Sequence, residues 1–194
     1  MKTADEIDKI KAVVLYLLKK CGGSLDYVAL FKYMYFAQRT YLVKYGRTMF
    51  DDSFRGFKRG PVPSFMMKTI KEVVNNNLGS QSNEMKDFAS SIKVSTIKNG
   101  IFIEANESPD MDELASAEVD VLNEILKKTE NLPVDFLSSK SHQDKAWINA
   151  NERAKSDPSD NCMLPLSIAQ AGNASKTILK YIRDNQIFTE FCRP

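Results

Sequence analysis

Apolar residues recur at helical spacing near the start of the chain. Ile7, Ile10 and Leu17 fall on one face of a helix predicted over residues 5–20, with Val14 on the same stripe. A Gly-Gly pair follows and ends this helix, because glycine accepts the left-handed conformation found at helix C-termini. The pattern predicts an amphipathic first helix whose apolar face enters the core.

A second helix is predicted over about residues 25–44, with Ser24 as its favoured N-cap, Leu25 or Asp26 as alternative starts, and Gly46 as its end. Its main stripe is large and mostly aromatic. The members are Tyr27, Phe31, Met34, Gln38, Tyr41 and Tyr45. Further apolar residues widen this stripe, which is typical of a helix at the centre of a fold. Because aromatic side chains dominate core packing, we assign the rings to the core and not to a cofactor pocket.

Next comes a segment in which large apolar and basic residues alternate. Residues 54–59 read Phe-Arg-Gly-Phe-Lys-Arg, and this period of two predicts a short strand. Residues 60–63, Gly-Pro-Val-Pro, predict a rigid turn, and the prolines also suit the first turn of a following helix. That third helix carries Phe65, Ile70 and Val73 on its apolar face.

A β-hairpin is predicted over residues 92–104. Two β-rich runs, Ile92–Ile97 and Ile101–Glu104, flank Lys98-Asn99-Gly100. Asn-Gly between such runs indicates a type I′ turn, which needs positive φ at both central residues.

Helices again dominate the second half of the chain. Ser116 is predicted as an N-cap, with Val119, Leu122 and Leu126 on the buried face of the helix that follows. One or two short helices are predicted over residues 133–154 and a last one over 174–187. The fold class is therefore α+β: a mainly helical single domain, residues 1–194, with a small antiparallel hairpin or sheet. Its core spans about residues 5–154, and a C-terminal helical extension spans about 165–194.

The composition of the chain argues against a nucleic-acid-binding protein, a membrane protein and a zinc protein. The chain has 194 residues, 43% of them hydrophobic, and its net charge is only +2, which argues against a dedicated nucleic-acid binder. No stretch approaches the roughly 20 apolar residues that span a bilayer, and acidic residues occupy the N-terminus where a signal peptide is apolar. Cys21, Cys162 and Cys192 lack the short spacing of a zinc site and are expected to be reduced thiols. We therefore expect a cytoplasmic protein without membrane contact.

Candidate catalytic chemistry is sparse. The sequence has no phosphate-binding Gly-rich loop and no nucleophile elbow, and it has only one histidine. An enzyme that uses His142, assisted by Cys162 or Asp144, remains one alternative. The structural reading is that His142 orients the segment around Trp147 through a hydrogen bond.

Charged clusters are also open to two readings. Asp51-Asp52 and Asp110 to Glu113 carry oxygen ligands for a divalent cation, but they lack a calcium-loop register, so we favour capping and solvation and expect no metal. The basic residues 47, 55, 58 and 59 are assigned to an exposed face in preference to a nucleic-acid site. An acidic protein surface remains an alternative partner.

The order of several motifs resembles one known family. Leu30-Phe-Lys-Tyr-Met-Tyr-Phe-Ala37 is similar to a helix of the Panacea antitoxin domain, also called SocA-like or phage-associated GepA-like. Tyr45-Gly46-Arg47 resembles the end of that helix, and Phe54 to Val62 resembles its second hallmark, an extended segment entering Gly-Pro-Val. Ser116 to Leu122, and Ser141-His142 with Ala146-Trp147, resemble later motifs, so the likeness covers about residues 12–154.

This resemblance implies an antitoxin of a bacterial or phage toxin–antitoxin system, which neutralises its cognate toxin protein by direct binding. It implies no catalytic residue and no cofactor, and it leaves homo-oligomerisation open. A DNA-associated phage or prophage regulator is a second alternative, although the small net charge counts against it.

Two sets of site residues follow. The residues expected to bind the toxin are Arg55, Phe57, Lys58, Arg59, Pro61, Val62 and Pro63. The residues whose role is expected to be mainly structural are Tyr35, Phe36, Gly46, Gly60, Pro61, His142 and Trp147.

Overall fold

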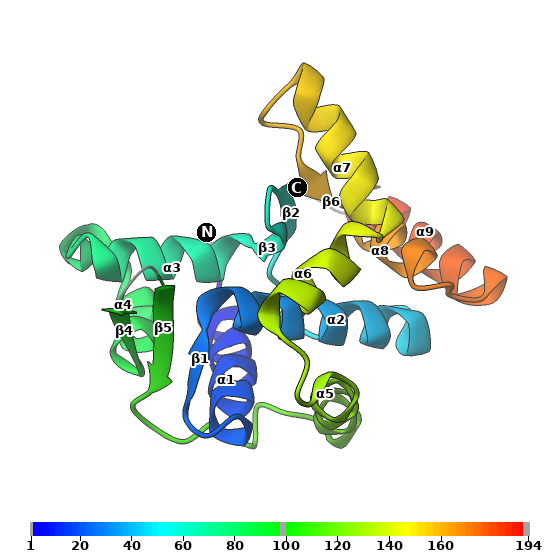
Figure 1. Ribbon diagram of the computed structural model, residues 1–194. Helices are drawn as coiled ribbons and strands as arrows, with labels where there is room; N and C mark the ends of the chain where they lie inside the picture. The colour runs from blue at the N-terminus through cyan, green and yellow to red at the C-terminus, as the bar shows by residue number, and fades with distance from the viewer. Residues whose placement is uncertain (1, 98–99, 192–194) are drawn as a thin grey trace.

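The computed structural model describes residues 2–97 and 100–191, and helices make up most of it (Figure 1). The helices are α1 (Ala4–Lys20), α2 (Tyr27–Tyr45), α3 (Ser64–Val74), the 3₁₀ turn η1 (Leu78–Ser80), α4 (Asn83–Ser90), α5 (Ser116–Thr129), α6 (Val134–His142), α7 (Lys145–Ser156), α8 (Pro165–Ala171) and α9 (Lys176–Phe191). The strands are β1 (Ser24–Asp26), β2 (Phe54–Phe57), β3 (Gly60–Pro63), β4 (Ile92–Ile97), β5 (Gly100–Ala105) and β6 (Cys162–Met163). The predicted class, a mainly helical α+β fold with antiparallel strands, is confirmed.

Helix α2 lies at the centre of the fold, as its apolar circumference predicted. It packs against α1, α5, α6, α8 and β3, and Figure 1 shows α5 on the opposite side of it from the β2–β3 hairpin. Phe31, Met34 and Tyr41 are almost completely buried. Among the predicted stripe, Tyr45 differs, because it lies at the exposed end of the helix with 40% of its surface accessible.

Local chemistry sets the two ends of α2. The Asp26 carboxylate accepts hydrogen bonds from the amides of Val28 (2.8 Å) and Ala29 (3.4 Å), so Asp26 is the N-cap. The favoured candidate, Ser24, is wrong because it begins strand β1, whereas the alternative, Asp26, is confirmed. Gly46 ends α2 with φ of 69°, as predicted, in the left-handed region that favours glycine.

The first sheet has the strand order β1–β5–β4 and is antiparallel throughout. Strands β4 and β5 form the predicted hairpin, with Ile97 opposite Gly100. Gly100 is therefore a strand residue paired with Ile97, so the prediction that it is a central residue of the turn is wrong. Lys98 and Asn99 lie outside the described residues.

The second sheet has the strand order β3–β2–β6. The predicted strand over residues 54–59 is β2, but residues 60–63 form strand β3 and not a turn. The turn is instead the pair Lys58-Arg59, because Phe57 lies opposite Gly60. Strand β6 completes the sheet with Cys162 opposite Arg55.

Two other helix predictions need correction. Ala115 is the N-cap of α5 and Ser116 its first residue, and the Glu118 carboxylate accepts from the Ala115 amide at 2.9 Å. The buried face of α5 contains the predicted Leu122 together with Val121 and Ile125, and the predicted Val119 and Leu126 are partly buried against the same core. Helix α4 was not predicted, because its short polar sequence lies next to a loop-like segment.

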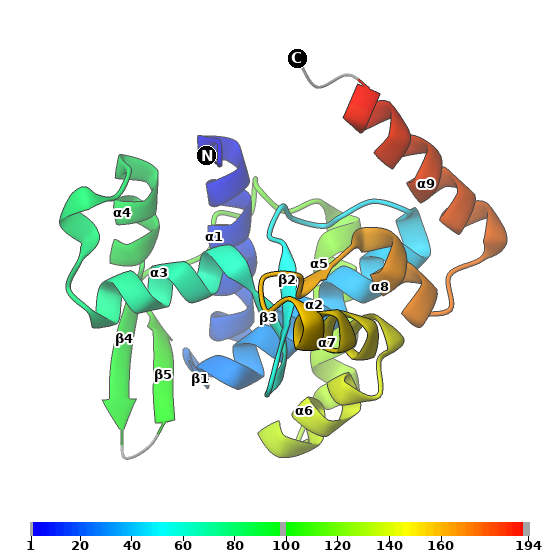
Figure 2. The ribbon, with the colours of Figure 1, turned by 90° about the horizontal axis from the view of Figure 1, so that it is seen from above.

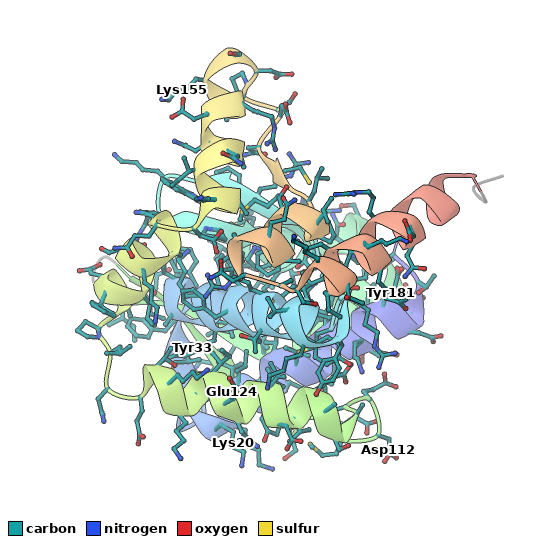
Figure 3. All side chains as sticks on the ribbon, turned by 90° about the vertical axis from the view of Figure 1, so that its right-hand side faces the viewer. Lys20, Tyr33, Asp112, Glu124, Lys155 and Tyr181 are labelled. Carbon is teal, nitrogen blue, oxygen red and sulfur yellow. The ribbon has the colours of Figure 1, made fainter. Side chains whose placement is uncertain are left out.

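The two C-terminal helices differ in position, because α8 packs against α2 and α7 whereas α9 extends from the body. Figure 2 shows α9 running outward from α8 with its later turns away from the other helices. Near its start, Ile182 is buried, and the Tyr181 ring lies against Gly46 at the end of α2. In Figure 3, Lys155 on α7 lies at the opposite extreme of the molecule from Asp112 and Glu124, which lie before and on α5.

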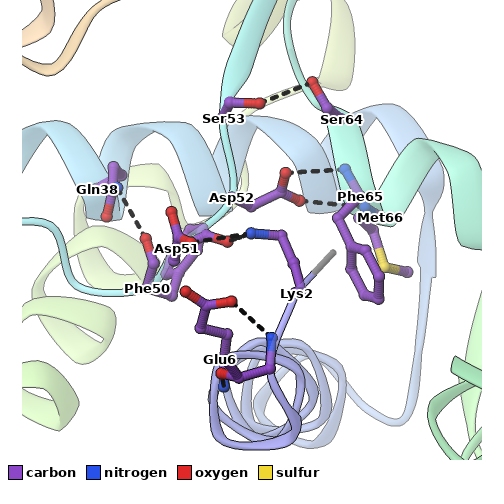
Figure 4. Close-up of polar contacts among 11 residues, drawn as sticks. Lys2, Glu6, Gln38, Phe50, Asp51, Asp52, Ser53, Ser64, Phe65 and Met66 are labelled. Carbon is purple, nitrogen blue, oxygen red and sulfur yellow. Dashed lines mark hydrogen bonds and ion pairs between the residues drawn. The ribbon is translucent and has the colours of Figure 1, made fainter. Parts of the chain in front are cut away.

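A buried carboxylate positions the start of α3 (Figure 4). Asp52 accepts hydrogen bonds from the amides of Phe65 (2.8 Å) and Met66 (3.1 Å), two of the donors that a helix start leaves unpaired. Burial raises the pKa of Asp52 to about 6, although both amides favour the ionised form. Asp51 is exposed and pairs with Lys2 at 3.2 Å. Asp52 thus fixes the helix that follows the β2–β3 hairpin.

None of the described helices combines the length and apolar composition needed to cross a bilayer.

Candidate functional site

The β2–β3 hairpin brings together all seven residues predicted to bind a partner. Phe57 exposes 46% of its surface, and Lys58 and Arg59 are exposed at the turn. Arg55 is partly exposed on β2. The three β3 residues, 61 to 63, are buried, so the outward surface of the hairpin comes mainly from β2 and the turn.

Gly60 lets the hairpin approach the helices behind it. Its φ is +99°, a conformation that other residues rarely adopt. A Cβ atom at this position would lie 2.4 Å from Ser141 Oγ and 2.8 Å from Lys32 Nζ. Both the backbone angle and the available space therefore require glycine.

Three helices hold the hairpin through hydrogen bonds to its backbone carbonyls. The donors are Lys32 Nζ to the Pro61 carbonyl (3.0 Å), Ser138 Oγ to the Arg59 carbonyl (2.8 Å) and Trp147 Nε1 to the Phe57 carbonyl (3.0 Å). They come from α2, α6 and α7, three elements separated along the chain. The hairpin is thus fixed from behind, at alternate residues, while its turn side chains face outward. We call these three donors the carbonyl clamp.

Lys32 is the most unusual member of the carbonyl clamp. It is only 1% exposed, and burial together with the nearby charge of Arg59 lowers its pKa to about 7. Among the described residues, no carboxylate forms an ion pair with it. Sequence reasoning missed Lys32, but a signal was available: it is the only charged residue between Tyr27 and Ala37.

His142 lies behind the hairpin turn, stacked on Trp147 with ring centroids 4.3 Å apart. Burial and then the charge of Lys32 lower the pKa of His142, and a backbone hydrogen bond at Lys58 acts in the opposite direction. Its Nε2 atom is buried and has no partner among the described atoms. His142 therefore contacts the Trp147 segment by stacking and not through the predicted hydrogen bond, and its role in orienting that segment stays a prediction.

The two groups named as partners of a catalytic His142 are engaged elsewhere. Asp144 caps α7 at the Ala146 amide (2.9 Å) and pairs with Arg39 of α2 (2.8 Å). Cys162 belongs to β6, on the far side of β2. Within the described part of the chain, no hydrogen bond joins His142 to either group.

The remaining motif residues pack the hairpin onto the core. Tyr35 is buried, and its ring meets Phe54 of β2 edge to face at a centroid distance of 5.4 Å. Phe36 is also buried on α2. Two residues further along β2, Gly56 leaves room for Ala150 of α7, whose Cβ would lie 3.2 Å from an added Cβ.

A groove of about 260 Å³ runs between the hairpin and α3. We call it the β2–α3 groove. It is lined by Arg55, Phe57, Val62, Ser64, Met67, Lys68, Lys71 and Glu72. The α3 wall of this groove has no direct signal in the sequence, because the helical pattern identified only the buried face of α3.

The predicted acidic clusters have local roles. Asp52 caps α3, and Asp110 accepts from the Asp112 amide at 2.9 Å. Over residues 2–97 and 100–191, no group of three or more His, Cys, Asp or Glu side chains is placed to hold a metal ion.

We expect Gly60→Ala to destabilise the fold by about 2–4 kcal/mol, from the unfavourable backbone angle and the collision with Ser141 and Lys32. Urea unfolding would measure the loss. Gly79→Ala is the matched control, because no atom lies within 4 Å of its added Cβ and its φ is not positive. Equal stabilities of the two variants would contradict the assigned role of Gly60.

Lys32 makes stability depend on pH. Its folded pKa of about 7 lies below the unfolded value of 10.5, so between these values the unfolded chain binds more protons and stability rises with pH. Relative to Lys32→Met, the wild-type free energy of unfolding should increase by about 1.5 kcal/mol from pH 7 to 8.5. Denaturant titrations at both pH values test this, and parallel pH profiles of the two proteins would refute it.

A family model matches the part of the chain that contains the hairpin and the helices behind it. The family model described as antitoxin SocA-like, Panacea domain, matches residues 30–148. The match includes Gly60 and all three donors of the carbonyl clamp. No curated protein and no solved structure matches the chain significantly. As the sequence motifs predicted, the chain belongs to the SocA-like antitoxin family that carries the Panacea domain.

Proposed function

We propose that this protein is the antitoxin of a bacterial or phage toxin–antitoxin system and neutralises its toxin by direct binding through the β2–β3 hairpin. Membership of the SocA-like family supports an antitoxin role in general and suggests a protein partner. The hairpin surface is made of Arg55, Phe57, Lys58 and Arg59, with β3 residues Pro61, Val62 and Pro63 as its support.

The observation that carries this proposal is the combination of a fixed backbone with an exposed turn. The carbonyl clamp holds alternate carbonyls of the hairpin, while an aromatic ring and two cations face outward. A surface that is ordered before binding loses less conformational entropy when the complex forms. Exposed aromatic and arginine side chains are also the types that contribute most to protein interfaces.

The charges of the turn suit a negatively charged partner surface. Neither Lys58 nor Arg59 forms an ion pair with a described residue. Their charges are therefore available to steer an acidic toxin surface toward the hairpin. A net charge of +2 over 194 residues gives less support to a nucleic-acid partner.

The proposal places the antitoxin in the cytoplasm and treats residues 1–194 as one functional unit. Residues 30–148, which match the family, would carry toxin recognition. Helices α8 and α9 would adjoin this region.

The direct test is co-expression with the product of the neighbouring gene, since toxin and antitoxin genes of such systems lie side by side. Wild-type protein should restore growth and co-purify with that product. Absence of both rescue and complex would contradict the proposed function.

Phe57→Ala should weaken the complex by about tenfold or more, because it removes the exposed aromatic side chain of the hairpin. Met111→Ala is the control, since Met111 has the same exposed fraction, 46%, but lies on the loop before α5. Calorimetric titration of both variants against the toxin measures the difference. Equal affinities for the two variants would exclude Phe57 from the interface.

A further inference from the structure

We infer that the β2–α3 groove binds an acidic segment of the partner protein, with one apolar side chain inserted between the hairpin and α3. This inference rests on the proposed function and adds the chemistry of the bound segment. It also adds α3, which the sequence did not indicate as part of the interface.

The walls of the groove provide an apolar contact. Phe57 presents a half-exposed ring from β2, and Met67 is partly exposed on α3. Val62 lies between them on β3 and is 5% exposed. Methionine adapts its shape to different neighbours, so this contact suits an aliphatic or aromatic side chain.

Charge distinguishes the groove from the rest of the surface. Arg55, Lys68 and Lys71 line it with only one carboxylate, Glu72, which gives three positive charges less one negative charge, or +2. The whole chain has the same net charge, from 27 cations and 25 acids. The groove thus carries a local positive charge, while the charges of all other residues sum to zero.

None of the three cations is neutralised by a described carboxylate. Arg55 donates to two uncharged oxygens, Asn161 Oδ1 at 2.9 Å and the Ser159 carbonyl at 3.2 Å, so its head is positioned but keeps its full charge. Lys68 and Lys71 are exposed and form no ion pair with any described residue.

The cations stand on two opposite walls. Arg55 belongs to β2, whereas Lys68 and Lys71 are three residues apart on α3 and so share one face of that helix. A bound segment with carboxylates on both sides of an apolar residue would meet both walls at once. The arrangement therefore favours a bound segment with the order acidic, apolar, acidic, and not merely any negatively charged segment.

The size of the groove favours a protein side chain as its occupant. Its volume of about 260 Å³ lies below the roughly 300–1,000 Å³ of most small-molecule sites. It accommodates a side chain with its flanking backbone along an open edge.

The test is a selection of random dodecapeptides displayed on phage against the immobilised full-length protein. Binding of the selected peptides is then measured on wild type, on Lys68→Glu/Lys71→Glu and on Lys127→Glu/Lys180→Glu. The control changes net charge equally and matches helix position, because Lys71 and Lys127 lie in last turns while Lys68 and Lys180 lie further inside their helices. Circular dichroism and urea midpoints confirm that both variants fold.

We expect the selected peptides to be rich in Asp and Glu around an apolar residue. They should bind the control like wild type and the Lys68/Lys71 variant at least about tenfold more weakly. The inference is overturned if no such peptides are enriched, or if they bind both variants equally. It is also overturned if the groove variant loses affinity only for a single-stranded oligonucleotide, which would assign the groove to phosphate.

Toxin rescue separates this inference from the proposed function. If wild type and the Lys68/Lys71 variant rescue growth equally, the groove assignment fails and the antitoxin role stands. If wild type does not rescue growth but the acidic peptides still require Lys68 and Lys71, the antitoxin role fails and the groove remains a peptide site.

Discussion

Backbone carbonyls of the β2–β3 hairpin need donors, and this requirement links most of the structure. Strand β3 is an edge of its sheet, so no further strand supplies hydrogen-bond donors on that side. Gly60 lets β3 approach α2 and α6, whose side chains contact it there. The Lys32–Pro61 bond is buried, and a buried carbonyl without a donor costs about 1–3 kcal/mol, so this bond prevents a substantial loss. The bonds from Ser138 and Trp147 are more exposed and mainly position the turn. Because the donors lie on α2, α6 and α7, the hairpin requires those three helices to be in place.

The carbonyl clamp also explains an otherwise costly feature, the buried amine of Lys32. Burial without a carboxylate partner lowers its pKa to about 7, which marks a penalty for the charged form. Its bond to the Pro61 carbonyl offsets part of this penalty and uses a side chain long enough to reach from α2. Nearby, Asp144 joins α7 to Arg39 of α2 and so positions Trp147, which makes the third bond of the clamp.

These interactions fix one side of the hairpin and leave the other side exposed, where we propose that the partner binds. The turn cations, Phe57 and the β2–α3 groove form a continuous surface on residues that need no rearrangement to be exposed. Asp52 fixes α3 in a similar way, because it accepts hydrogen bonds from the first amides of the helix that forms the second wall of the groove. Family membership suggests a protein partner, and we propose that this partner binds at this surface.

Sequence reasoning succeeded where the signal was local. The periodicity of α1 and α2, the left-handed Gly46 and the β4–β5 pairing follow from short-range preferences, and these predictions are confirmed. The motif residues Gly60 and Trp147 were identified through resemblance to a family. Their structural roles depend on contacts between segments that are distant in the sequence.

The predictions that failed depend on such distant contacts. Strands β1 and β6 have only three and two residues, which is too short for an alternating pattern to be recognised in the sequence. They form because β5 and β2 pair with them. Residues 60–63 looked like a turn because Gly and Pro dominate them, but pairing with β2 makes them a strand. The groove could not be predicted either, because its walls meet only after the hairpin packs beside α3.

Hydrogen–deuterium exchange of the free antitoxin and of its complex with the neighbouring gene's product tests the central claim most directly. The account predicts slower amide exchange on binding in residues 54–72, which contain the hairpin and the groove-lining part of α3, with no change in α5. Protection of α5 or α9 with unchanged exchange in residues 54–72 would contradict it.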